Sequence, residues 1–230
     1  MMKRFLIVTM MLWNLFFGHD AIAQDWADKA HYAQANIELI SRNEGPQLTV
    51  LIGNSITEFW MDTHPQFFKN NQLLGRGISG QVSSQMLARF RQDVINLHPR
   101  AVVINCGTND IAENNGPYDE DITMDNITSM TELALLNDIT VILTSVLPCD
   151  HFGWNPSVLN VKSKIQSLNA RIVLLAESLS LPYVDYYNSM VYDESGAINP
   201  QYSDDGVHPS PLGYTVMERL LTDCLKKYKP

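Results

Sequence analysis

Two kinds of hydrophobic spacing alternate along the chain from residue 24 onward. Short runs rich in β-branched residues indicate buried strands, and segments whose apolar residues recur every three or four positions indicate amphipathic helices. The predicted strands cover residues 48–52, about 72–74, 101–106, 140–147 and 181–185. The predicted helices cover residues about 25–42, 86–97, 121–137, 161–179 and 211 to the C-terminus. This alternation is typical of βαβ units around a parallel sheet.

Apolar stripes and end signals support the helix predictions. The first helix carries a stripe that we expect to face the core, made of Trp26, Ala30, Ala33, Ile37 and Ile40. Ser210 and Pro211 are typical of an N-cap and a first helical position. The stretch of about 25 residues that follows the fifth strand is predicted to be irregular. Without repeats, linkers or low-complexity tracts, residues 24–230 form one predicted domain.

Residues 1–23 have the pattern of a secretory signal peptide. Lys3 and Arg4 give a basic start, residues 5–17 are uncharged and largely apolar, and Ala-Ile-Ala at 21–23 precedes Gln24. The apolar run is shorter than a membrane-spanning helix requires. We therefore expect a secreted or periplasmic protein without stable membrane insertion. A retained N-terminal anchor helix is the alternative.

Composition and charge narrow the classes of function. The chain has 230 residues, of which 45% are hydrophobic and 18% charged, and its formal net charge is −9. Removal of residues 1–23 leaves 207 residues with 14 basic and 24 acidic side chains, a net charge of −10. This balance argues against nucleic-acid partners, which require clustered Lys and Arg. The three cysteines, Cys106, Cys149 and Cys224, predict buried small side chains rather than a disulfide framework.

Residues that carry chemistry follow the predicted strands. The four blocks are GNSIT at 53–57, GRGISG at 75–80, GTND at 107–110 and DGVHP at 205–209. Open parallel sheets bind ligands at the carboxyl ends of their strands, so these blocks are expected to meet in one site.

The second block also spells the dinucleotide-binding fingerprint. Gly75, Gly77 and Gly80 have the GxGxxG spacing. That fingerprint belongs in the first βα turn, with an acidic residue at the end of the next strand. Here it follows the second strand, and the third strand ends in Asn105 and Cys106. The sequence therefore predicts neither NAD nor any other cofactor.

The four blocks contain the residue types that ester hydrolysis needs. A serine hydroxyl becomes nucleophilic when a histidine takes its proton, and an acid bonded to the other imidazole nitrogen fixes the tautomer. The tetrahedral intermediate requires preorganised N–H donors. Asn109 can donate from its side chain, and Ser55 and Gly77 can donate from the backbone. Glycine at position 77 would let the main chain approach the reacting carbonyl closely.

In order and interval, these blocks resemble the SGNH hydrolases, also called the GDSL esterase and lipase family. The resemblance spans about residues 48–214. It implies Ser55 as nucleophile, His208 as general base and acid, and Asp205 as the residue that orients His208. It also implies an oxyanion hole of Ser55, Gly77 and Asn109, in a flavodoxin-like three-layer α/β/α sandwich with a five-stranded parallel sheet of order 2-1-3-4-5. Asn54 replaces the more usual Asp, which puts loop support in doubt rather than chemistry.

Each assignment has an alternative. Ser55 could be the N-cap of the following helix, and Asn109 and Asp110 could be turn residues. Asp205 and His208 could bind a metal with Asp204, but no further His or carboxylate cluster lies nearby in sequence, so no metal is predicted. Three other histidines are expected to be structural or solvated: His31, His64 and His98.

The loop after the fourth strand contains residues that could contact the substrate. Its position places His151, Phe152 and Trp154 on the predicted rim of the site, where they could stack on a sugar or merely pack the loop. Phe59 and Trp60 are predicted core residues. We expect a serine esterase acting on small acyl, chiefly O-acetyl, esters of carbohydrate. The alternatives are a lysophospholipase or arylesterase of the same family and a non-catalytic glycan-binding module.

Overall fold

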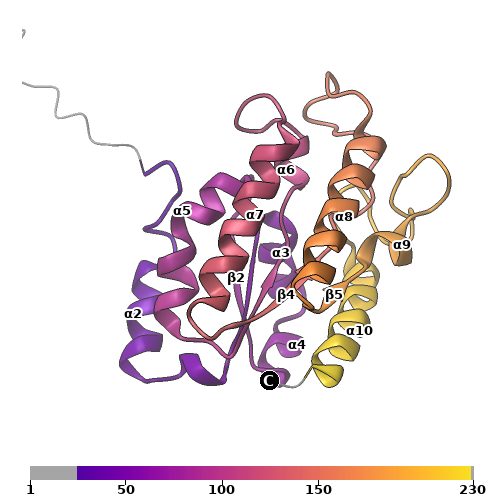
Figure 1. The fold of residues 1–230 in the computed structure, drawn as a ribbon. Coiled ribbons are helices and arrows are strands. Elements are labelled where there is room, and N and C mark those ends of the chain that lie inside the picture. Colours follow the sequence, from indigo (N-terminus) through magenta and orange to yellow (C-terminus); the bar gives the residue numbers. More distant parts are fainter. Residues whose placement is uncertain (1–24, 229–230) are drawn as a thin grey trace, which may run out of the picture.

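The computed structural model describes residues 25–228, and a five-stranded parallel sheet forms its centre. The strand order is β2-β1-β3-β4-β5 (Figure 1). The bounds are β1 Thr49–Gly53, β2 Leu73–Gly77, β3 Ala101–Ile104, β4 Thr140–Thr144 and β5 Tyr183–Val184. This is the predicted flavodoxin-like order, so the fold prediction is confirmed.

Helices cover both faces of the sheet and complete three layers (Figure 1). One face is covered by α5 (Ser83–Asp93), α7 (Glu120–Leu135) and α8 (Val161–Ser178), with α2 (Ala33–Ser41) beside α5. The opposite face is covered by α3 (Ser55–Thr63), α4 (Pro65–Asn70) and α10 (Pro211–Lys227). Two short helices follow strands, α6 (Thr108–Ile111) and α9 (Tyr186–Met190). Single 3-10 turns lie at Gly45–Gln47 and Ile95–Leu97.

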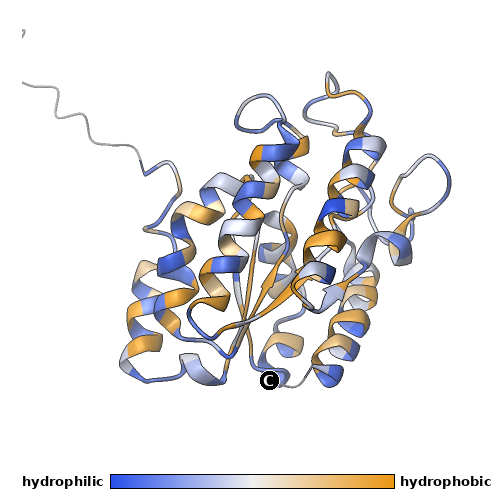
Figure 2. Ribbon diagram, viewed as in Figure 1, coloured by the Kyte–Doolittle hydropathy of each residue, from blue (hydrophilic) through white to orange (hydrophobic). Residues whose placement is uncertain are grey.

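The central strands are buried on both faces, as their continuous apolar runs predict. Val50 and Ile52 pack into the core under α5, α7 and α8, whereas Leu51 packs into the core under α3 and α10. Side chains alternate between the two faces because successive residues of a strand point in opposite directions. Figure 2 shows the strands as an apolar centre between helices whose outward faces are more polar.

The last helix begins as its sequence predicts. Ser210 accepts a hydrogen bond from the Gly213 N–H at 3.3 Å, and Pro211 is the first helical residue. Lys226 and Lys227 occupy the final turn, where cations interact favourably with the helix dipole.

The prediction for the first helix was wrong in length and in its buried face. Only residues 33–41 are helical, and Trp26, Ile37 and Ile40 are exposed. The buried side chain of α2 is Asn36, which donates to Asp93 Oδ1 at 2.7 Å. A polar network therefore decides which face of α2 is covered, because a buried amide or carboxylate must be hydrogen-bonded.

Other differences concern short elements and strand ends. The short helices α4, α6 and α9 were not predicted, and α9 lies in the segment expected to be irregular. Strand β2 continues to Gly77, whereas β3 and β4 end two and three residues earlier than predicted. No helix within residues 25–228 is long and apolar enough to cross a membrane. The predicted signal peptide, residues 1–23, lies outside the described residues.

Candidate active site

Ser55, His208 and Asp205 lie in one hydrogen-bonded line. Ser55 Oγ is 2.9 Å from His208 Nε2, and His208 Nδ1 is 2.6 Å from Asp205 Oδ2. Ser55 is the first residue of α3, directly after β1, and the other two residues belong to the loop ahead of α10. The fold thus joins side chains that are 153 positions apart in sequence.

Asp205 shapes its own loop as well as binding the imidazole. Its Oδ1 atom accepts the backbone N–H groups of Val207 and His208 at 2.9 and 2.8 Å, and Gly206 between them has φ of +80°. Partial burial alone would raise the pKa of Asp205, but the hydrogen bonds from His208 and Val207 outweigh it and lower this pKa to about 2. The carboxylate is therefore ionised at neutral pH.

Asn54, rather than Ser55, caps α3. The Asn54 side chain accepts a hydrogen bond from the Ile56 N–H at 3.0 Å. The alternative that Ser55 serves as the N-cap is therefore wrong, and the Ser55 hydroxyl contacts His208 instead. Asn54 thus fulfils at least the capping role that the more usual Asp would have.

A cavity of about 290 Å³ opens beside Ser55 and His208. Its lining residues are Ser55, Phe59, Ser79, Gly80, Asn109, Asn114, Trp154 and His208. The rings of Phe59 and Trp154 lie 5.3 and 6.5 Å from the His208 ring, measured between centroids. Two aromatic side chains therefore bound the space in which an ester would meet the serine.

The structure separates the predicted rim residues. Trp154 lines the cavity, whereas Phe152 is fully buried in the core. His151 is exposed, contacts Asp150 and is not among the lining residues. The expectation that Phe59 is a core residue was wrong, because it is 41% exposed and lines the cavity, while Trp60 is indeed buried.

Gly80, not Gly77, lies at the cavity. A Cβ atom on Gly77 would come within 2.3 Å of the Glu58 backbone nitrogen, so this glycine permits α3 to pack on β2. Gly80 has φ of +78° and open space around it, and no hydrogen bond of the described residues uses its N–H. Of the two glycines, Gly80 is therefore the one whose main chain borders the cavity.

Asn109 faces the same cavity and is fixed at both ends of its amide. Its Nδ2 donates to the Gln81 carbonyl at 3.0 Å, and its Oδ1 accepts from Asn114 Nδ2 at 3.0 Å. An NH₂ group carries two hydrogens, so one remains for a ligand. Asn109 is therefore more than a turn residue.

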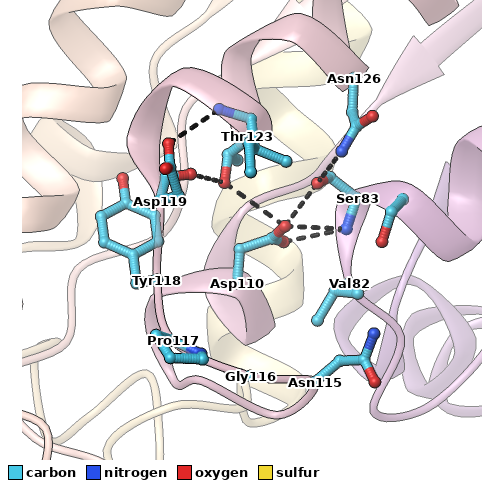
Figure 3. A pocket seen from close by; sticks show the side chains of 12 residues that line it. Val82, Ser83, Asp110, Asn115, Gly116, Pro117, Tyr118, Asp119, Thr123 and Asn126 are labelled. Carbon is cyan, nitrogen blue, oxygen red and sulfur yellow. Dashed lines mark hydrogen bonds between the residues drawn. The ribbon is translucent and has the colours of Figure 1, made fainter.

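The neighbouring Asp110 holds the GTND turn against α5 and α7. Its carboxylate accepts the Ser83 N–H at 3.0 Å and also contacts the hydroxyl groups of Ser83 and Thr123 (Figure 3). Ser83 begins α5, where a carboxylate interacts favourably with the helix dipole. Burial raises the pKa of Asp110, and the hydrogen bonds from Ser83 oppose that rise. The pocket of about 150 Å³ in Figure 3 does not include Ser55.

A buried charged network supports the site from behind. Arg89 donates to Gly53 O, Gln81 Oε1 and Asp93 Oδ2, which links the end of β1 to the loop after β2. Arg76 joins the network through Asn36. Sequence reasoning missed this support. The available signal was the Arg-x-x-x-Asp spacing of Arg89 and Asp93 on the buried face of an amphipathic helix.

The described residues contain no group of three His, Cys, Asp or Glu side chains that could hold a metal ion. The cysteines Cys106, Cys149 and Cys224 are buried and free. Burial raises the pKa of the Cys149 thiol to about 12, which disfavours a thiolate nucleophile.

A doubly covered parallel sheet with a hydrogen-bonded Ser, His and Asp at its carboxyl edge defines a serine hydrolase. The absence of the G-x-S-x-G elbow around Ser55 separates it from the α/β-hydrolases. The chain belongs to the GDSL-like lipase/acylhydrolase family, whose profile matches residues 51–216. It is thus a carboxylic ester hydrolase of the serine type, and the predicted family is confirmed.

Solved structures agree with this family. A proposed acylhydrolase from Bacteroides fragilis is 53% identical over 89% of this chain and 98% of its own, with a TM-score of 0.85. A GDSL-like lipase from Bacteroides thetaiotaomicron is 52% identical over 87% of this chain and 98% of its own, with a TM-score of 0.84. The acetylxylan esterase Axe2 from Geobacillus stearothermophilus shares the fold at 16% identity, over 80% and 96% of the two chains, with a TM-score of 0.62. No curated protein matches the sequence.

Proposed function

We propose that this protein hydrolyses small acyl esters, chiefly O-acetyl groups on carbohydrate, through an acyl-enzyme on Ser55. The observation that carries the proposal is the line of Ser55, His208 and Asp205 beside a cavity of about 290 Å³. In this mechanism His208 Nε2 takes the hydroxyl proton as Ser55 Oγ attacks the ester carbonyl. The same imidazolium then protonates the departing alcohol, and Asp205 stabilises its charge.

Three N–H groups are proposed to stabilise the oxyanion. Ser55 is the first residue of α3, so its N–H has no partner within the helix. Gly80 contributes the second N–H in place of Gly77, and the free Nδ2 hydrogen of Asn109 contributes the third. Water then attacks the acyl-enzyme with His208 as base, and the same donors stabilise the second tetrahedral intermediate.

The dimensions and walls of the cavity favour a short acyl group and a sugar alcohol. Phe59 and Trp154 lie beside the His208 ring, and the cavity that they line has a volume of about 290 Å³. Trp154 is 49% exposed, so part of its ring can stack on a sugar face outside the cavity. A lysophospholipase would need room for a long acyl chain, whereas a cavity of about 290 Å³ favours a short one.

The nucleophile is tested by Ser55→Ala with p-nitrophenyl acetate. We expect kcat to fall by about 10⁴-fold or more, because the loss of the nucleophile removes the acyl-enzyme route. The matched control Ser84→Ala changes a serine outside the cavity and should retain wild-type kcat. Both variants should have the wild-type melting temperature. Retained turnover in Ser55→Ala would exclude Ser55 as the nucleophile.

The acyl preference is tested with acetyl, butyryl and octanoyl esters and with acetate release from acetylated glycans. We expect kcat/KM to drop steeply from acetyl to octanoyl and acetate release to require Ser55. A preference for octanoyl esters would support the lipase alternative. EDTA should leave the rates unchanged, whereas loss of activity restored by zinc would support a metal-dependent reaction.

We further propose that residues 1–23 are a cleaved signal peptide and that the mature protein is secreted or periplasmic. The basic, apolar and small-residue segments of this region support export. The test is the N-terminal residue of the protein recovered outside the cytoplasm, which should be Gln24. Recovery of the intact chain from the membrane fraction would instead support a retained anchor.

A further inference from the structure

Asn114 joins two parts of the cavity that the proposed mechanism treats separately. Its Nδ2 donates to Asn109 Oδ1 at 3.0 Å, and its Oδ1 accepts from Trp154 Nε1 at 2.8 Å. One side chain therefore contacts both the proposed oxyanion donor and the exposed aromatic residue of the rim. Asn114 itself lines the cavity but contacts neither Ser55 nor His208 through a hydrogen bond.

The end of α6 places Asn114 over Asn109. After Ala112, Glu113 adopts φ of +60°, and its N–H donates to Asp110 O at 3.0 Å. The Asn114 N–H then donates to Asn109 O at 3.1 Å. This pair of hydrogen bonds is a Schellman motif, which reverses the chain at a helix C-terminus. Asn114 is thus bound to Asn109 through both its backbone and its side chain.

The hydrogen bond from Asn114 selects one orientation of the Asn109 amide. An amide that accepts at Oδ1 must present its NH₂ group on the opposite branch, here toward Gln81 O and the cavity. In the flipped orientation, the Asn109 carbonyl would face the oxyanion, and two NH₂ groups would oppose each other at Asn114. Donation to Oδ1 also polarises the amide and strengthens its N–H donors.

Trp154 is held by the same residue. Its indole N–H is bound to Asn114, and the adjacent Asn155 donates to Ala112 O at 3.0 Å. The loop after β4 is therefore attached to the segment after α6 at two consecutive residues. The indole N–H orients the Asn114 amide by bonding to its oxygen, which leaves Nδ2 directed at Asn109.

We propose that Asn114 is a positioning residue that holds the Asn109 amide in its donating orientation and connects it to Trp154. The inference rests on the proposed function, because it acts through the oxyanion donor. Asn114 touches no reacting atom in this mechanism, and its Nδ2 also donates to Gly80 O at a longer 3.4 Å. Its shorter bond to Asn109 Oδ1, at 3.0 Å, is the one through which the proposed effect on kcat depends on Asn109. That dependence separates a positioning role from general support of the loop.

The test is a double-mutant cycle with Asn109→Ala and Asn114→Ala, measured with p-nitrophenyl acetate. Removal of one oxyanion donor lowers kcat by about 10²–10³-fold, which is the expectation for Asn109→Ala. Loss of its orientation in Asn114→Ala should lower kcat by about 10-fold, with KM changed less than about 3-fold. The double variant should have the kcat of Asn109→Ala alone, because no oriented amide remains to be lost.

Two further variants separate this role from folding and from rim binding. Asn115→Ala changes the next residue, which lines the other pocket, and should keep wild-type kcat and KM. Trp154→Phe keeps an aromatic ring but removes the donor to Asn114, so kcat should fall less than in Asn114→Ala. All variants are compared at equal folded fraction, checked by melting temperature.

The possible results distinguish the positioning role of Asn114 from the proposed ester hydrolysis. Single effects on kcat that multiply in the double variant, or an unchanged kcat in Asn114→Ala, would overturn the positioning role. Those results leave the proposed function intact as long as Ser55→Ala is inactive. Turnover by Ser55→Ala would overturn the proposed function itself, whatever the Asn114 cycle shows.

Discussion

At the scale of single residues, Asp205 combines two tasks in one carboxylate. Oδ2 accepts a hydrogen bond from Nδ1 of the His208 imidazole, and Oδ1 accepts hydrogen bonds from two backbone N–H groups of the same turn. These bonds explain the lowered pKa, because each favours the ionised form. Replacement of Asp205 therefore affects both the proposed catalysis and the loop that presents His208.

The pH dependence of stability follows from this pKa. An unperturbed Asp has a pKa of about 3.9, and that of Asp205 in the folded protein is about 2. A lowered folded-state pKa stabilises the protein above about pH 4, and this contribution is lost as pH falls toward 2. The melting temperature of Asp205→Asn should therefore lie slightly below that of wild type at pH 5–7, and the gap should narrow between pH 4 and 2.

The catalytic consequence of the same variant is much larger. The amide of Asp205→Asn cannot hold the required His208 tautomer, so kcat should fall by about 10⁴-fold at neutral pH. The effect on stability is small because the Asp205 side chain is 54% exposed. A stability gap that stays constant down to pH 2 would contradict the cause assigned to the pKa.

The four motif blocks and their resemblance to a known family predicted Ser55, Asn109, Asp205 and His208, although each residue type alone had another use at its position. The choice between Gly77 and Gly80 could not be made in this way. Both glycines belong to one motif, and only the extent of β2 decides which of them packs under α3 and which turns toward the cavity. The contacts of Asn114 likewise could not be predicted from the sequence, because loops bring these side chains together.

At the scale of elements, β2 and α3 meet closely enough to require glycine at position 77. A Cβ there would lie 2.3 Å from Glu58 N and 2.6 Å from Asn54 O, and both are backbone atoms that a side-chain movement cannot relieve. The contact fixes the start of α3, and with it Ser55, against the sheet. The approach of a helix to a strand thus contributes directly to the geometry of the site.

Gly77→Ala and Gly80→Ala should therefore fail in different ways. Gly77→Ala should lower the free energy of unfolding by about 3 kcal/mol or more, the upper range of overpacking costs. Gly80→Ala has room for its methyl group, and its free energy of unfolding should fall by about 1–2 kcal/mol because position 80 has a positive φ. Its kcat should fall more than its stability suggests, because the strained peptide moves the proposed donor N–H.

Urea unfolding and steady-state kinetics on both variants measure these effects. A stable Gly77→Ala protein with reduced kcat, beside an active Gly80→Ala protein, would return the donor role to Gly77.

The helices and strands themselves were largely predictable, since most of them carry continuous apolar runs or regular stripes. The first helix was not, because its buried residue is the polar Asn36 and its apolar residues face outward.

At the scale of the whole molecule, buried charge links the first helix to the site. Arg76, Arg89 and Asp93 are almost completely buried. Arg89 pairs with the Asp93 carboxylate at 2.9 Å, and Arg76 is connected to it through the Asn36 amide. Asn36, Gln81 and backbone carbonyls, including Gly53 O, accept further N–H groups of the two arginines. Sequence patterns do not reveal such a network, because its members come from α2, β2 and α5, and only Arg76 lies within one of the four motif blocks.

Asp93→Ala should be strongly destabilising. It removes the carboxylate that pairs with buried Arg89 and accepts from Asn36, and breaking a buried ion pair costs about 3–5 kcal/mol. The control is Asp121→Ala, which breaks the Arg171 pair of similar length at 2.7 Å, where Asp121 is 85% exposed. That variant should unfold at nearly the wild-type urea midpoint. Equal decreases in the free energy of unfolding of the two variants would show that burial does not determine how much these ion pairs stabilise the protein.

The segment ahead of α2 has a practical consequence for producing the enzyme. The Ala27 carbonyl accepts from Gln81 Nε2, and the carbonyl of Gln81 in turn accepts from Asn109. Recombinant protein trimmed to the family match at residues 51–216 would keep the catalytic motifs but lose this brace, the first two residues of β1 and the second half of α10. The active unit therefore starts well before its recognisable family signature, and an affinity tag is better fused to the C-terminus than placed near Asp25.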